Sequence, residues 1–188
     1  MNRPLLALLL AATTSGAAAL SVSGTVTGSP PPQARVAGFV LDPAGQPGAE
    51  VVSVPVQDGR FSLDLPDVAP PGRYLSSLRP DAIAWPGVLE PITVSGEASI
   101  ADLRLYVYAD RNGNGRYDSG EGLQEAVPVV GRATLVLSWA STDARVNAAR
   151  GFSATLGRGW NGLLVEVGRT VKVAPAGRTV NVTLTVGR

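Results

Sequence analysis

The feature that most constrains this chain is a series of short segments in which apolar and polar residues alternate, separated by Gly, Pro, Asn and Asp. In residues 102–109, for example, Leu103, Leu105 and Val107 share one face, and the arginine and tyrosines share the other. A period of two predicts a β-strand, because successive side chains of a strand point to opposite faces. No segment after residue 19 keeps a 3.6-residue apolar period. The sequence therefore predicts an all-β fold, with a strand spacing typical of sandwiches.

Strong turn sequences divide the chain. Asp42-Pro-Ala-Gly45 and Asp58-Gly59 are typical turn formers, and the second predicts a hairpin. We expect antiparallel Ig-like or prealbumin-like sandwich modules at 20–97 and 98–188, although one continuous sandwich is the alternative. The segments expected to form strands after the signal are 20–27, 35–41, 50–56, 61–65, 73–75, 92–95, 98–109, 132–139, 152–157, 163–167, 169–174 and 179–186.

The first 19 residues have the order of an export signal. Arg3 supplies a positive start, residues 5–12 are apolar, and Ala17-Ala-Ala19 is a small-residue cleavage site. The apolar run is shorter than the roughly 20 residues that span a bilayer. The alternative is a buried N-terminal helix. We expect a secreted, periplasmic or cell-envelope protein with no transmembrane segment after cleavage.

The absence of cysteine and histidine excludes several kinds of chemistry. A Ser-His-Asp triad, a cysteine nucleophile and an imidazole zinc site all need these residues. Because no disulfide can brace the exported chain, a bound ion would be a useful cross-brace. The formal net charge of +1 gives no indication of nucleic-acid binding.

Residues 110–121 match the spacing of a calcium loop. Gly115 falls at position six, where such a loop turns sharply, and oxygen donors occupy the ligand positions. Calcium prefers six to eight oxygens, so we expect a Ca²⁺ site with a dissociation constant of about 10⁻⁵ to 10⁻³ M. The alternative is a plain turn rich in Asn and Gly. The expected ligands are Asp110, Asn112, Asn114, Arg116 through its carbonyl, Asp118 and Glu121.

The flanking sequences indicate that this EF-hand-like loop joins strands. The preceding segment alternates, and Gly120, Gly122 and Pro128 oppose a helix before the strand expected at 132–139. The ion would therefore hold a connection between two strands in place. It would not open a pair of helices as a signalling switch.

Two parts of the chain resemble known families. Val36-Ala-Gly-Phe-Val40, Asp42-Pro-Ala-Gly-Gln-Pro-Gly48, Asp58-Gly-Arg-Phe-Ser-Leu63 and Gly72-Arg-Tyr74 make residues 35–74 similar to carboxypeptidase regulatory-like, transthyretin-type sandwiches. Residues 105–130, with the loop at 110–121, resemble the calcium-binding B-type repeats of bacterial surface adhesins. The second resemblance implies calcium binding through the loop residues named above. Unlike those adhesins, this chain has only one such loop.

These observations favour an exported calcium-binding protein with a structural, adhesive or accessory role at the cell envelope, and no catalytic activity. Its partners would be surface proteins or polysaccharides. A first alternative is carbohydrate binding through the aromatic faces of Trp85, Trp139, Trp160 or Tyr108, of which Trp160 resembles a turn residue. A second alternative is an envelope-polymer hydrolase with Asp110 and Asp118 as paired carboxylates, although these residues fit better as ligands.

Overall fold

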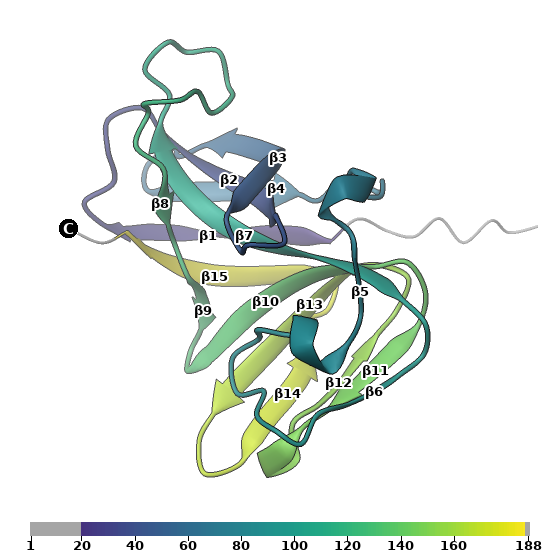
Figure 1. Ribbon diagram of the computed structural model, residues 1–188. Helices are drawn as coiled ribbons and strands as arrows, with labels where there is room; N and C mark the ends of the chain where they lie inside the picture. The colour runs from purple at the N-terminus through teal and green to yellow at the C-terminus, as the bar shows by residue number, and fades with distance from the viewer. Residues whose placement is uncertain (1–19, 187–188) are drawn as a thin grey trace, which may run out of the picture.

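The computed structural model describes residues 20–186, so the export signal predicted for residues 1–19 lies outside the described residues. The described chain is all-β, as predicted, with three single-turn 3₁₀ segments. Figure 1 shows the strands in an upper and a lower group that meet at a waist. The elements are β1 (Ser21–Gly28), β2 (Ala34–Leu41), β3 (Pro47–Pro55), β4 (Arg60–Asp64), η1 (Gly72–Tyr74), β5 (Ser76–Ser77), η2 (Pro80–Ala82), β6 (Thr93–Ser95), β7 (Ser99–Ala109), β8 (Gln124–Glu125), β9 (Pro128–Val130), β10 (Ala133–Ala140), β11 (Ala144–Asn147), η3 (Ala149–Gly151), β12 (Ser153–Leu156), β13 (Gly159–Val167), β14 (Val171–Pro175) and β15 (Thr179–Val186).

The main sheet curves until it almost closes on itself. Its strand order is β3-β2-β7-β10-β9-β15-β1-β4, and β13, β14, β5 and β8 pair outside this path. The two strands at the ends of the path, β3 and β4, are joined by the predicted Asp58-Gly59 turn, so the ends lie together. The β1–β15 ladder is parallel, and the other ladders of residues 20–186 are antiparallel. The result is a sandwich-like, nearly closed barrel.

Strand β7 connects the two groups of Figure 1. Its C-terminal part pairs with β2 in the upper group, and its N-terminal part pairs with β10 in the lower group. The division at residue 97 stays a prediction, but one sheet contains strands from both sides of it, as the pairing of β1 with β15 shows.

Two apolar cores fill the interior. The first lies inside the curved sheet and includes Val36, Leu105 and Leu184. The second includes Trp85 and Phe152 and lies between the lower part of the main sheet and the small β12-β11-β6 sheet. The alternation predicted for residues 102–109 is confirmed, since Leu103, Leu105 and Val107 face the first core. The other face of β7 is also covered, because Tyr106 and Tyr108 belong to a separate aromatic cluster.

Two local predictions were wrong or incomplete. Residues 73–75 were expected to be a strand, but residues 72–74 form the 3₁₀ turn η1 and the strand β5 follows. Pro71 and Gly72 explain why η1 begins here. Proline fixes its own φ angle, and glycine adopts a wider range of backbone angles than other residues. Strands β8, β9 and β11 were not expected. Among residues 20–186, no helix has the length and apolar character needed to cross a membrane.

Candidate metal-binding loop

The 110–121 loop projects from the upper end of β7 and returns to β8 (Figure 1). It is therefore a connection between strands, as predicted. Gly115 has a φ of 78°, a left-handed value that glycine adopts readily, at the position where the template requires a sharp turn.

Asp110 is one of the two buried acids of the loop, together with Glu121. The residue is only 6% exposed, and its Oδ2 accepts a hydrogen bond from the Gly115 amide at 3.0 Å. Its other oxygen, Oδ1, is buried and finds no hydrogen-bond partner among the described residues. A buried carboxylate oxygen without a partner is costly, so this atom needs a donor or a cation.

The side chains at positions three, five and nine meet at one atom. The Nδ2 groups of Asn112 and Asn114 donate to Asp118 Oδ2 at 2.7 and 2.6 Å. The Oδ1 atoms of the same asparagines accept hydrogen bonds from the amides of Asn114 and Arg116. These local bonds shape the loop. Three of the predicted ligands therefore lie together. In this arrangement the two asparagines contact Asp118 through their amide nitrogens.

Glu121 closes the loop from its last position. It is 6% exposed, and its two oxygens accept hydrogen bonds from the amides of Arg111 at 3.0 Å and Asp118 at 2.9 Å. One carboxylate thus holds the second and the ninth residues of the loop. Each oxygen has a further lone pair that could bind a cation.

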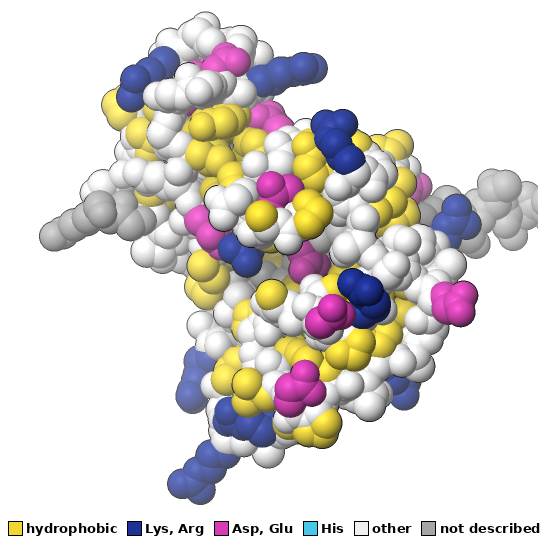
Figure 2. Space-filling model, viewed as in Figure 1, with side chains coloured by type: hydrophobic (Ala, Val, Ile, Leu, Met, Phe, Trp, Pro, Cys, Tyr) yellow, Lys and Arg dark blue, Asp and Glu magenta, His cyan; other side chains and the backbone are white. Residues whose placement is uncertain are grey.

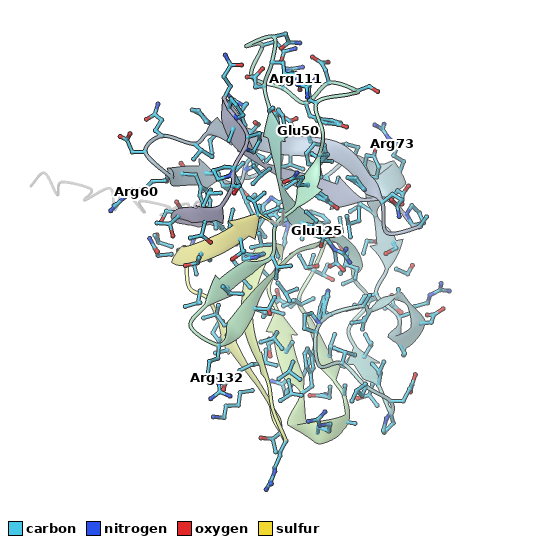
Figure 3. The ribbon with its side chains drawn as sticks, turned by 90° about the vertical axis from the view of Figure 1, so that its left-hand side faces the viewer. Glu50, Arg60, Arg73, Arg111, Glu125 and Arg132 are labelled. Atoms are coloured by element: carbon cyan, nitrogen blue, oxygen red, sulfur yellow. The ribbon has the colours of Figure 1, made fainter. Side chains whose placement is uncertain are left out.

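Glu50 on β3 also contacts the loop. The sequence did not indicate this contact, because Glu50 lies 67 residues before its partner, Tyr117. Its Oε2 accepts the Tyr117 amide at 2.8 Å, and Figure 3 shows Glu50 just below the loop. In a planar trans peptide the carbonyl points opposite to the N–H. The bond therefore turns the Arg116 carbonyl, a predicted ligand, away from Glu50.

Tyr117 anchors the loop on the aromatic cluster of the sheet. Its ring makes edge contacts with Phe39 at 5.8 Å and Tyr108 at 5.5 Å between centroids. Burial raises the pKa of Tyr108, whose hydroxyl shares a hydrogen bond with Ser53 Oγ at 2.9 Å. The one signal for this anchor in the sequence was that Tyr117 is aromatic and stands at a loop position that supplies no calcium ligand.

Arg35 links Asp110 to the sheet from the other side. Its guanidinium is 3.6 Å from Asp110 Oδ2 and donates to Ser53 Oγ at 2.8 Å. A cleft of about 240 Å³ beside the loop is lined by Arg35, Asp110 and Gly113, among others. Asp110 thus forms part of the wall of this cleft.

Within residues 20–186, no group of three or more acidic side chains is arranged to hold a metal ion. The loop's acids are held apart by bonds to its own backbone and asparagines. The donor set predicted from the sequence also includes two amide oxygens and a backbone carbonyl. These neutral donors fit calcium, which accepts amide and backbone oxygens together with carboxylates.

The tryptophans are less available than the carbohydrate alternative requires. Trp85 is buried in the second core, and Trp139 and Trp160 are partly buried in strands. The expectation that Trp160 lies in a turn was wrong, because it pairs with Trp139 between β13 and β10. Its indole nitrogen donates to the Pro66 carbonyl at 3.0 Å.

Comparisons with protein-family models, with curated proteins and with solved structures found no match for this chain. The resemblances to transthyretin-type sandwiches and to adhesin B-type repeats remain predictions.

Proposed function

We propose that this chain is an exported, non-catalytic calcium-binding protein with a structural, adhesive or accessory role at the cell envelope. Bound calcium would supply positive charge that neutralises Asp110, Asp118 and Glu121. The ligands would be the six residues predicted from the sequence. In this proposal the chain contributes a fixed arrangement of oxygen donors around the calcium ion.

The observation that carries this proposal is the unpaired Oδ1 of Asp110. Its partner oxygen already accepts the Gly115 amide, so the carboxylate is oriented by the turn of the loop. The free oxygen is buried, and Asp110 is one of the residues that line the cleft beside the loop. A cation at this atom would remove the cost of leaving it unpaired.

The convergence of Asn112, Asn114 and Asp118 gives further support. These side chains already meet, so ligand binding requires local rotation of two amides and no movement of the sheet. Turning each Nδ2 away from Asp118 frees that carboxylate. The asparagine oxygens have lone pairs beyond those used by the loop's backbone.

The proposed role is a static one. Glu50, Tyr117 and Arg35 tie the loop to β2, β3 and β7, so an ion inside it would stiffen this end of the sheet. A chain without cysteine has no disulfide to serve the same purpose. A rigid, exposed loop suits an extracellular structural module better than a sensor.

Isothermal titration calorimetry tests the proposal directly. We expect one calcium ion per chain, and binding at least about 100-fold weaker after Asp110→Asn, because one of three ligand charges is lost. Asp64→Asn, at an exposed position on β4, is the matched control and should bind as the unmodified protein does. The proposal fails if the unmodified protein binds no calcium, or if Asp110→Asn binds it equally well.

The same titration tests Glu50 as a positioning residue. Glu50→Gln should weaken calcium binding about tenfold, because groups that orient ligands typically contribute 10- to 100-fold to affinity. Glu97→Gln, an exposed acid outside the loop, is the control. Equal affinities in the two variants would show that the Glu50–Tyr117 bond does not position the Arg116 carbonyl.

A further inference from the structure

The main sheet forks at its waist. The β7–β10 ladder ends at the Leu103–Leu137 pair, although both strands continue. Beyond this point β7 pairs with β8, and β10 pairs with β9. The Ala126 amide donates to the Leu105 carbonyl at 2.9 Å, so the segment from β8 to β9 bridges the two branches.

A cleft of about 210 Å³ lies at this fork. Its apolar lining comes from the loop before β6 and from both branches, and includes Ala84, Pro86, Val127 and Val136. Figure 2 shows hydrophobic, acidic and basic side chains at the waist of the molecule. The cleft is therefore a mainly apolar space, and its charged lining residues are Asp102, Arg104 and Glu125.

Asp102 is the acidic group on the cleft wall that has no salt bridge within the described residues. Both its oxygens lie 3.0 Å from the same donor, the Trp85 indole nitrogen. Burial raises the pKa of Asp102, and the Trp85 N–H and the Ser138 hydroxyl oppose this effect. One indole N–H leaves most of the lone pairs of a carboxylate unused.

The other charges of the cleft largely cancel. Arg104 and Glu125, both partly exposed, form an ion pair at 3.2 Å, and Figure 3 shows Glu125 at the waist. Arg104 also acts on Asp102, but its guanidinium is shared with Glu125.

A second polar group lies beside Asp102. Ser138 is opposite Asp102 in the β7–β10 register, and its buried hydroxyl favours the charged form of Asp102. The Trp85 N–H and this hydroxyl leave lone pairs of the carboxylate unused, and neither group fills the cleft. Asp102 therefore suits a ligand that donates hydrogen bonds.

We propose that this cleft binds a small organic ammonium ion. The charged nitrogen donates to Asp102, and a compact apolar body lies between Pro86, Val127 and Val136. Charge-assisted hydrogen bonds are about twice as strong as neutral ones, so the charge decides the selectivity. This site is separate from the metal-binding loop and does not depend on it.

The test is an NMR titration of the Trp85 indole N–H, assigned through its loss in Trp85→Phe. The probes are benzylammonium chloride and benzyl alcohol, which share a shape and differ in charge. We expect saturable shifts with benzylammonium, and at least about tenfold weaker binding of benzyl alcohol. Asp102→Asn should weaken benzylammonium binding by a similar factor, whereas Asp64→Asn should leave it unchanged.

Equal affinity for the two probes, or no saturable shift with benzylammonium, would overturn the proposal. So would full benzylammonium affinity in a folded Asp102→Asn protein. If Asp102→Asn does not fold, the comparison of the two probes on the unmodified chain decides the matter alone.

Discussion

Calcium at about 100 times its dissociation constant is expected to raise the melting temperature of this protein by about 5–10 °C. Linkage at this concentration contributes about 2.7 kcal/mol to the free energy of unfolding. For a chain of 150–250 residues, each kcal/mol shifts the melting temperature by about 2–4 °C. Differential scanning calorimetry of decalcified protein, with and without calcium, measures the shift.

Asp110→Ala and Glu121→Ala should abolish this rise. Asp110 is the buried acid with the unpaired oxygen, and Glu121 closes the loop. Sodium chloride at matched ionic strength controls for screening, and Asp64→Ala controls for the loss of an acid elsewhere. A rise of the same size in the Asp110→Ala protein would place the calcium outside this loop.

Gly24→Ala is expected to lower the free energy of unfolding by about 3 kcal/mol, because the strand cannot accommodate a side chain there. A Cβ at Gly24 would clash with the Val182 carbonyl oxygen, on the parallel partner strand. The obstacle is backbone, so relief requires β1 and β15 to separate. This ladder joins the start of the described chain to its end.

Gly72→Ala is the matched control for that substitution. A Cβ at Gly72 meets nothing within 4 Å, so the change should stay within about 0.5 kcal/mol of the unmodified protein. Urea unfolding followed by circular dichroism measures both variants. Equal stabilities of the two variants would show that β1 and β15 are not packed this closely.

The regular strands could be predicted from the sequence because their side-chain pattern is local. The alternation in β7 and the Asp58-Gly59 turn both report on neighbouring residues, and both predictions are confirmed. The short strands β8, β9 and β11 were missed, since two to four residues hardly show a period. The parallel pairing of β1 with β15 joins distant segments and has no local signal.

The candidate site also combines features that a local sequence pattern predicts with features that depend on distant segments. The predicted ligand positions come from a fixed spacing within twelve residues, and they stay a prediction. The structure brings the side chains of Asn112, Asn114 and Asp118 together by hydrogen bonds. Glu50 and Arg35 come from β3 and β2, so their contacts with the loop depend on how the sheet curves. No pattern within a window of residues could have identified them.

Amide hydrogen exchange across the loop, with calcium and with a chelator, tests the central idea most directly. The informative amides are those of Gly115, Tyr117 and Asp118, which donate to Asp110, Glu50 and Glu121. An ion held by the loop should slow their exchange by about 100-fold, the factor that corresponds to 2.7 kcal/mol. Identical exchange of these amides in the two samples would mean that no ion is held there.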